Sequence, residues 1–229
     1  MFLVTNAADL EPEYRRILLY SQPGLGKTSC LAQLPGRTLI IDCDKGYKVL
    51  IGMKARNVDL APVEDDPESV LEIVRDLQGR CDYQNVCLDS LTQYQNRARA
   101  HYTTIGKNGK KMELGYYQDM DFDTLHLLDE LDKLRCNVVV TAWEDQFEKT
   151  LATGERIFIA KPQLFRKALV DTICGVVDVV GKISVTPDGQ RYILLSGDQT
   201  TVAKDRIEKR PWCWPQDLIP THKQEANSQ

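Results

Sequence analysis

Short, almost wholly apolar runs alternate along this chain with longer segments of helical periodicity. Apolar runs this short are typical of strands that are covered on both faces. They lie at residues 15–20, 37–42, 85–89 and 137–142. Between them, helices are predicted at 27–34, 66–77, 93–102 and 120–135. Strands alternating with helices predict an α/β fold with a mainly parallel central sheet flanked by helices.

Apolar spacing also indicates which helix faces point inward. In the second predicted helix the core positions are Val70, Leu71, Val74 and Leu77. In the last one, Leu125, Leu128, Leu131 and Leu134 are expected to face the core. Residues 103–116 are polar and glycine-rich, so a loop is expected there.

After Trp143 the pattern changes. Residues 146–160 resemble a hairpin or loop around a Thr-Gly pair, and a helix is expected at 162–172. Residues 176–185 and 190–195 alternate around Pro-Asp-Gly, which predicts an antiparallel hairpin extending the sheet. We therefore expect an N-terminal arm at 1–14, a single core at 15–210 and a C-terminal tail at 211–229, with no internal repeat.

Composition narrows the class of protein only a little. The 229 residues carry a net charge of −4, so any contact with nucleic acid must come from local patches. The sequence has no run of ~18 apolar residues and no signal-peptide pattern, so we expect a cytoplasmic protein without membrane contact. Seven cysteines without a C-x-x-C pair favour reduced core thiols over disulfides or structural zinc.

The most specific motif follows the first predicted strand. Residues 21–28 read SQPGLGKT, which is close to the phosphate-loop pattern G-x-x-x-x-G-K-[ST], with Ser21 in place of the first glycine. Such a loop directs backbone N–H groups at phosphate oxygens, and the following helix adds its dipole. Lys27 is expected to neutralise the β- and γ-phosphates and Thr28 to ligate Mg²⁺. The predicted ATP-binding residues are Ser21, Gln22, Pro23, Gly24, Leu25, Gly26, Lys27, Thr28 and Ser29.

Acidic residues end two of the predicted strands. Asp89 ends the third strand, where a second Mg²⁺ ligand beside Thr28 belongs. Ser90 follows it, so the water-activating acid cannot be the next residue. The other candidate is Asp44, just after the second strand, whose carboxyl end points into the ligand crevice. The alternative is that Asp42 and Asp44 only solvate a strand end.

Together these motifs resemble the RecA-type ATPase core, and more narrowly the phage nucleotide-binding ATPases of recombination and single-strand annealing. The residues that carry the resemblance are GLGKT at 24–28, IDCDKG at 41–46, LDS at 88–90 and VVVTA at 138–142. RecA relatives usually have Glu where this chain has Asp44, which implies slow hydrolysis. Members of the narrower family often have His in place of Trp143, so a γ-phosphate sensor here is open, and Glu144 could take part.

The resemblance implies further site residues. RecA-like proteins place DNA-binding loops after these strands, here with Lys107, Lys110 and Lys111 beside tyrosines, and with Lys149 and Arg156. Ordinary solvated loops are the alternative. Lys204 and Arg206 stand where RecA and KaiC-like oligomers carry a finger that reaches a neighbour's γ-phosphate.

The function that this implies is ATP hydrolysis coupled to single-stranded DNA in recombination or annealing. The expected partners are single-stranded DNA and further copies of the chain in a ring or filament, with a single-strand-binding protein as a further candidate. In a phage-encoded protein, the compartment would be the host cytoplasm. A DNA-independent ATPase that loads or regulates replication proteins is the alternative. A small-molecule kinase is less favoured, because Arg156 is the one arginine in the two candidate lid segments.

Overall fold

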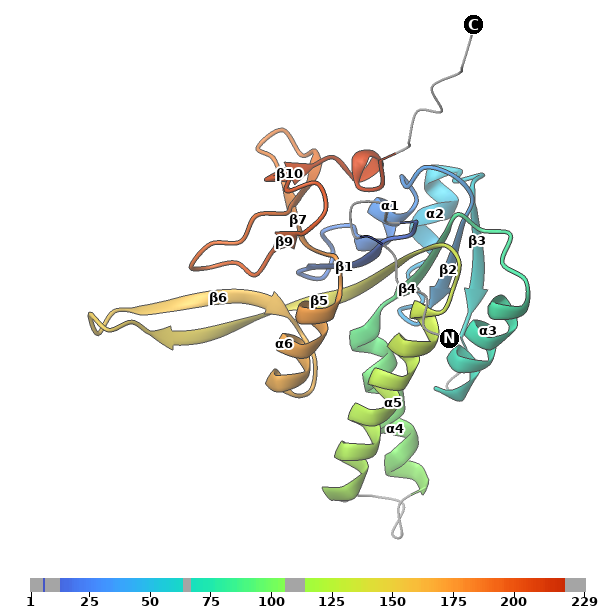
Figure 1. Cartoon of the computed structure of the whole chain (residues 1–229), viewed down its shortest axis with the longest axis horizontal. Helices are drawn as coiled ribbons and strands as arrows, with labels where there is room; N and C mark the ends of the chain where they lie inside the picture. The colour runs from blue at the N-terminus through green and yellow to red at the C-terminus, as the bar shows by residue number, and fades with distance from the viewer. Residues whose placement is uncertain (1–5, 7–12, 64–66, 106–113, 221–229) are drawn as a thin grey trace, which may run out of the picture.

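A large, mainly parallel sheet organises the molecule (Figure 1). The computed structural model describes residues 6, 13–63, 67–105 and 114–220. Within them, the strands of one sheet run in the order β10-β8-β7-β1-β5-β4-β2-β3, with β6 paired to β5 and β9 to β7. The six strands from β7 to β3 are parallel to their neighbours, and the remaining pairings are antiparallel. The parallel strands are β1 (Arg16–Ser21), β2 (Thr38–Asp42), β3 (Val58–Pro62), β4 (Asn85–Asp89), β5 (Asn137–Thr150) and β7 (Val179–Val185). The others are β6 (Arg156–Pro162), β8 (Arg191–Leu194), β9 (Lys204–Asp205) and β10 (Trp212–Cys213).

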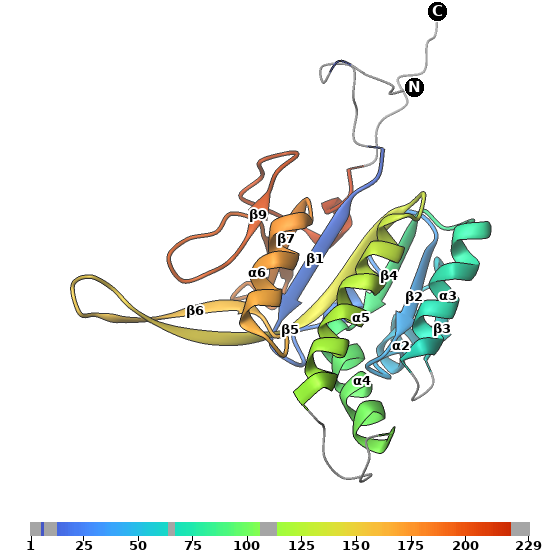
Figure 2. The same cartoon turned by 60° about the horizontal axis from the view of Figure 1, so that its bottom comes forward.

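Helices cover both faces of this sheet. They are α1 (Lys27–Leu31), α2 (Lys48–Met53), α3 (Glu68–Gly79), α4 (Leu91–Ile105), α5 (Leu114–Asp132) and α6 (Lys167–Val176). Residues of α3, α4, α5 and α6 share one apolar cluster with one face of the strands, and Figure 2 shows α3, α4 and α5 on that side. Residues of α1 and α2 lie in the cluster on the other face, together with Leu218 and Ile219, which follow the short 3₁₀ turn η2 (Pro215–Asp217). The predicted doubly covered parallel sheet is confirmed.

The predicted elements differ from the structure mainly at their ends. The loop expected at 103–116 is shorter, because α4 continues to Ile105 and α5 begins at Leu114. The helix expected at 162–172 begins only at Lys167, because β6 runs to Pro162. The hairpin interpretation of 146–160 is confirmed by the antiparallel pairing of β5 with β6. This hairpin extends well away from the body of the molecule (Figure 1).

One predicted helix face is partly wrong. Leu125 is 41% exposed, whereas Leu127 is fully buried together with Leu131 and Leu134. The inward stripe of α5 is therefore shifted, and Met120 and Thr124 complete it. The expected core face of α3 is confirmed, since Val70, Leu71 and Val74 are buried and Leu77 packs against the same cluster.

The core continues beyond residue 210. Strand β10 pairs with β8, and Cys213, Leu218 and Ile219 are buried in the cluster that includes α1. Trp212 and Trp214 pack edge to face with ring centroids 5.1 Å apart. The stretch after Pro211 is therefore a structural edge of the sheet. All seven cysteines are unpaired, and five of them are buried, as predicted.

Candidate nucleotide site

The phosphate loop joins the end of β1 to the start of α1. Gly24 and Gly26 both have positive φ angles, 84° and 88°, which only glycine adopts without strain. The backbone N–H of Cys30 donates to the carbonyl of Gly26 at 2.9 Å, so the first helical turn starts at the loop itself. Strand, loop and helix therefore follow one another as the motif predicts.

Lys27 lies inside the loop rather than in solvent. Its side chain is 6% exposed, and its Nζ donates to the carbonyls of Ser21 and Gln22 at 3.4 and 3.5 Å. Burial lowers the pKa of Lys27, while the charges of Asp89, Asp44 and Glu144 act in the opposite direction. A cation that is mostly desolvated and held by long contacts is ready to bind a strong anion.

Thr28 and Asp89 are brought together across the sheet edge. The Thr28 hydroxyl donates to Asp89 Oδ2 at 2.5 Å, and the Thr141 hydroxyl of β5 donates to Oδ1 at 2.5 Å. Asp89 is fully buried, and this burial raises the pKa of its carboxyl above the usual range, although both hydroxyl contacts oppose the shift. The two predicted Mg²⁺ ligands, Thr28 and Asp89, are therefore neighbours. The hydrogen bond from Thr141 fixes the orientation of the Asp89 carboxylate.

The two acidic residues after β2 have different surroundings. Asp42 is paired in register with Asp89 and is 3% exposed. Its carboxylate accepts the backbone N–H groups of Asp44, Gly46 and Tyr47 at 3.1, 3.2 and 3.3 Å. Asp42 therefore shapes the loop that follows the strand. Asp42 is therefore too buried to solvate a strand end, whereas the role of Asp44 stays a prediction.

Asp44 is held by two donors at the same edge. Ser90 Oγ donates to Asp44 Oδ1 at 3.2 Å, and Trp143 Nε1 donates to Oδ2 at 3.3 Å. The backbone N–H of Asp44 also donates to the carbonyl of Asp89 at 3.1 Å. Burial raises the pKa of the Asp44 carboxyl, and the Trp143 and Ser90 hydrogen bonds oppose that shift. Trp143 thus orients the candidate base, which is a contact that no sequence motif announces.

Arg191 is a second site neighbour that the sequence did not indicate. Its Nε donates to the carbonyl of Leu25 at 2.9 Å, so the guanidinium of β8 lies against the phosphate loop. A Cβ added to Gly26 would lie 2.1 Å from that Nε. Arg191 is far from the loop in sequence and belongs to no motif. Only knowledge of the pairing of β8 with β7 could have predicted its position beside the loop.

An ion pair lies beside the same edge. Lys182 of β7 donates to Glu144 Oε1 at 3.2 Å, and the Glu144 side chain is 3% exposed. Its other oxygen, Oε2, is buried without a hydrogen-bond partner within the described residues. Glu144 therefore adds negative charge near Lys27, in line with its effect on the pKa of Lys27.

The residues of the expected finger lie elsewhere. Lys204 pairs with Val180 on β7, and the Arg206 backbone N–H donates to the carbonyl of Asp178, before β7 begins. Both side chains donate to the carbonyl of Gly175 near the C-terminus of α6, Lys204 at 3.1 Å. In their own chain the two side chains therefore donate to a carbonyl at the C-terminus of α6. They lie near the start of β7, whereas the phosphate loop follows the end of the neighbouring parallel strand β1.

The expected DNA-binding residues are described only in part. Lys107, Lys110 and Lys111 lie outside the described residues. Lys149 and Arg156 lie near the end of the β5–β6 hairpin, where Arg156 pairs with Glu148 at 3.0 Å. The hairpin starts from the strand that carries Trp143 and therefore connects directly to the candidate site.

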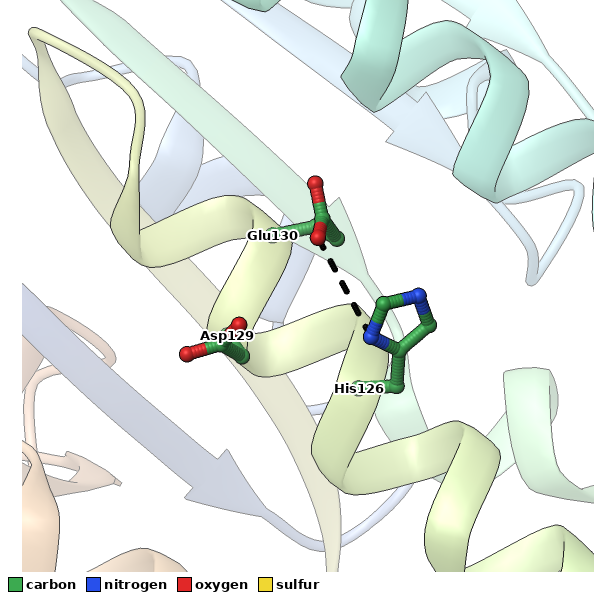
Figure 3. Close-up of side chains that lie close together, drawn as sticks. All are labelled: His126, Asp129 and Glu130. Atoms are coloured by element: carbon green, nitrogen blue, oxygen red, sulfur yellow. Dashed lines mark ion pairs between the residues drawn. The ribbon is translucent and has the colours of Figure 1, made fainter.

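A group of metal-ligating residue types on α5 is not part of this site. Figure 3 shows His126, Asp129 and Glu130 on neighbouring positions of the helix, with the His126 and Glu130 side chains 4.0 Å apart. Lys133 binds both acids, Asp129 at 3.0 Å and Glu130 at 2.6 Å. The hydrogen bond from Lys133 lowers the pKa of Glu130. A lysine already neutralises these acids, so we assign no metal to them.

The nucleotide site itself fits a bound nucleotide with Mg²⁺. The donor set combines a desolvated lysine with a hydroxyl and a buried carboxylate, which is the chemistry that phosphate and a hard cation require. Gly46 packs close to these ligands, because a Cβ added there would lie 3.1 Å from Thr28 Oγ1. A larger residue at 46 would press on the Thr28 hydroxyl, which is the predicted metal ligand.

Comparisons with known proteins agree with this geometry. Residues 13–207 match a family described as AAA domain. The crystal structure of the KaiC-like protein PH0186 from Pyrococcus horikoshii OT3 is similar at 13% identity and a TM-score of 0.51, covering 88% of this chain and 83% of that one. A prototypical ATPase from the type III secretion system of pathogenic bacteria matches at 14% identity and a TM-score of 0.45, covering 76% of this chain and 51% of that one. A search of curated proteins finds no significant match.

The similarity to the KaiC-like protein and the arrangement of the sheet confirm the expected α/β architecture with a mainly parallel central sheet. In the part of the chain that the structure describes, no helix combines the length and apolar character needed to cross a bilayer. The family match spans most of the sequence and includes the phosphate loop, Asp44 and Asp89. The chain therefore belongs to the AAA domain family and has the nucleotide-binding core of a P-loop ATPase.

Proposed function

We propose that this protein hydrolyses ATP and couples hydrolysis to single-stranded DNA in recombination or strand annealing. The single observation that carries the proposal is the Trp143–Asp44 hydrogen bond. It joins the candidate water-activating carboxylate to the strand that extends into the projecting hairpin. A ligand on the hairpin thus has a short covalent and hydrogen-bonded path to the reacting centre.

In this proposal each residue at the sheet edge has a separate task. Lys27 binds the β- and γ-phosphates, and the loop N–H groups hold their oxygens. Thr28 and Asp89 hold Mg²⁺, which when bound neutralises phosphate charge. Asp44 orients the attacking water and accepts its proton, and its raised pKa makes it a better base than an exposed carboxylate. Ser90 and Trp143 are positioning residues for that carboxylate.

The finger role of Lys204 and Arg206 belongs to the same proposal. A homo-oligomer, as a ring or a filament, would place them at a neighbour's γ-phosphate, since their own phosphate loop follows the other end of the adjacent strand. To act there, both would have to leave the Gly175 carbonyl. Assembly would then supply the missing charge and couple hydrolysis to oligomerisation.

The test is DNA affinity measured by fluorescence anisotropy over a range of salt concentrations. We expect binding that weakens with salt, and a slope that falls by about 0.7 for each phosphate of a single strand that the protein no longer neutralises. Replacing Lys107, Lys110 and Lys111 by alanine should reduce both affinity and slope. Lys48→Ala on α2 is the matched control, because Lys48 is exposed and lies with the other helix layer. Unchanged affinity and slope in the triple variant would move the DNA site elsewhere.

A DNA-independent ATPase that loads or regulates replication proteins is the second candidate. The end of the hairpin favours it, because Glu148 and Glu155 offset the charges of Lys149 and Arg156. Phe158 on the same hairpin is 58% exposed, which suits contact with a protein. Absence of any DNA binding, with ATP and Mg²⁺ present, would favour this candidate. A single-strand-binding protein would then be a natural partner to test on the hairpin.

A further inference from the structure

A polar cavity of about 300 Å³ is lined in part by Trp143, the residue whose indole donates a hydrogen bond to Asp44. It is formed by α4, by β5 where the hairpin begins, and by the residues that follow β6. Its lining includes Asn96, Arg99, Gln163 and Phe165. The volume is at the lower end for small-ligand sites, so the cavity suits one flat, ring-sized group.

The lining offers both stacking and hydrogen bonding. The Phe165 ring is 37% exposed, and the Arg99 guanidinium lies 4.9 Å from its centroid. Among the described residues, the side chains of Gln163 and Arg99 donate no hydrogen bond, so their N–H groups remain available to a ligand. Gln95 forms a fixed wall instead, because it donates to Thr124 and accepts from the Phe165 backbone.

One wall of the cavity is hydrogen-bonded to the candidate base. The Trp143 backbone N–H donates to Thr92 Oγ1 at 2.9 Å, and the Thr92 hydroxyl donates to the carbonyl of Gln163 at 2.9 Å. The Gln163 backbone N–H returns a hydrogen bond to the carbonyl of Trp143 at 2.7 Å. The Trp143 indole in turn donates to Asp44. A ligand that contacts this wall therefore acts on the orientation of the Asp44 carboxylate.

We propose that this cavity binds one base of a single DNA strand and that the bound base orients Asp44 through Trp143. Base stacking on an aromatic ring is the usual way in which proteins hold single strands, and amide side chains suit the polar edges of a base. The inference rests on the proposed DNA function and adds to it a base subsite and its link to catalysis. Phosphate contacts are left to Lys107, Lys110 and Lys111, because Asp145 in the cavity lining offsets the charge of Arg99.

The experiment uses Trp143 as its own reporter. The chain has three tryptophans, so replacing Trp212 and Trp214 by phenylalanine leaves Trp143 alone. The protein, saturated with adenylyl imidodiphosphate and Mg²⁺, is titrated with a thymidine oligonucleotide and with an abasic strand of equal length. The two strands carry the same phosphates and differ only in bases. We expect the thymidine strand to change the Trp143 emission and to bind about 5- to 150-fold more tightly than the abasic strand.

Variants assign that preference to the cavity. Phe165→Ala should remove most of the thymidine preference, and Asn96→Ala at an exposed position should reduce it. Phe122→Ala, whose ring is 70% exposed on α5 outside the cavity, is the matched control and should keep the preference. In Trp143→Phe, which lacks the reporter, DNA binding is measured with a labelled oligonucleotide. The factor by which DNA increases the rate of ATP hydrolysis should be smaller in this variant than in the wild type. Thermal unfolding of each variant identifies any loss of fold.

The outcomes separate this inference from the function on which it rests. Binding of both strands with equal affinity would overturn the base subsite and leave the DNA function intact. A thymidine preference that survives in both Phe165→Ala and Asn96→Ala would overturn it as well. Binding of neither strand would overturn the DNA function and, with it, the subsite.

Discussion

Replacing Gly26 by alanine tests whether Arg191 lies against the phosphate loop. Gly24 and Gly26 have nearly the same positive φ, 84° and 88°, so an alanine at either position meets similar backbone strain of about 1–2 kcal/mol. They differ in surroundings: a Cβ at 24 meets nothing within 4 Å, whereas a Cβ at 26 would lie 2.1 Å from Arg191 Nε. The Gly26 variant must therefore also displace Arg191 from the Leu25 carbonyl, and the loss of one hydrogen bond between partly exposed groups costs about 0.5–1.5 kcal/mol more.

The assay is urea unfolding of the nucleotide-free protein, followed by tryptophan fluorescence. We expect Gly24→Ala to lower the free energy of unfolding by about 1–2 kcal/mol. Gly26→Ala should lower it by about 1.5–3.5 kcal/mol, the sum of the backbone strain and the lost hydrogen bond. Adding Arg191→Ala to Gly26→Ala should cost less than Arg191→Ala alone costs the wild type, because the hydrogen bond is already broken. Equal destabilisation by the two glycine variants, with strictly additive effects of Arg191→Ala, would refute the contact.

The remaining predictions concern charges at the site. Because burial raises the pKa of Asp89 above its ordinary 3.8, ionised Asp89 destabilises the folded state at neutral pH. Asp89→Asn should thus raise the thermal midpoint, by a margin that shrinks as the pH falls towards 3.8, while Mg²⁺-dependent ATP affinity is lost. Asp44→Asn should slow hydrolysis far more than it weakens ATP binding, and single-turnover rates compared with Kd decide this. Mixing Lys27→Ala with Arg206→Ala subunits should restore hydrolysis above either alone if Arg206 acts across an interface. If mixed oligomers are shown to form but hydrolyse ATP no faster than either variant alone, Arg206 acts only within its own chain, at the Gly175 carbonyl.

Local motifs predicted which residues meet at the candidate nucleotide site. The phosphate loop, Thr28 and Asp89 belong to short patterns whose geometry follows from strand–loop–helix connectivity, so their placement was readable from the sequence. Asp44 was expected at this edge from its position after a strand, and the register pairing of β2 with β4 explains why it lies beside Asp89; its role as a base stays a prediction. Buried runs at strands β1, β2, β4 and β5 were equally plain, because all have apolar side chains on both faces.

Contacts between distant segments were not readable in the same way. Arg191 reaches the loop from the antiparallel strand β8, and Trp143 of β5 reaches Asp44 across the intervening strand β4. Helix α2 and strand β3 were missed, because both are short and apolar residues such as Val49, Ile51 and Leu60 stay exposed in them. The shifted face of α5 has a similar cause: leucines lie on several sides of that helix, and only packing selects Leu127 over Leu125.

ATP hydrolysis measured with and without a thymidine oligonucleotide tests the central claim most directly. The wild-type protein, with Mg²⁺ present, should hydrolyse ATP slowly alone and faster with the single strand, and Lys27→Ala should be inactive under both conditions. A rate that the oligonucleotide leaves unchanged would contradict the coupling of hydrolysis to DNA. A Lys27→Ala variant that keeps the wild-type rate would contradict the assignment of the site itself.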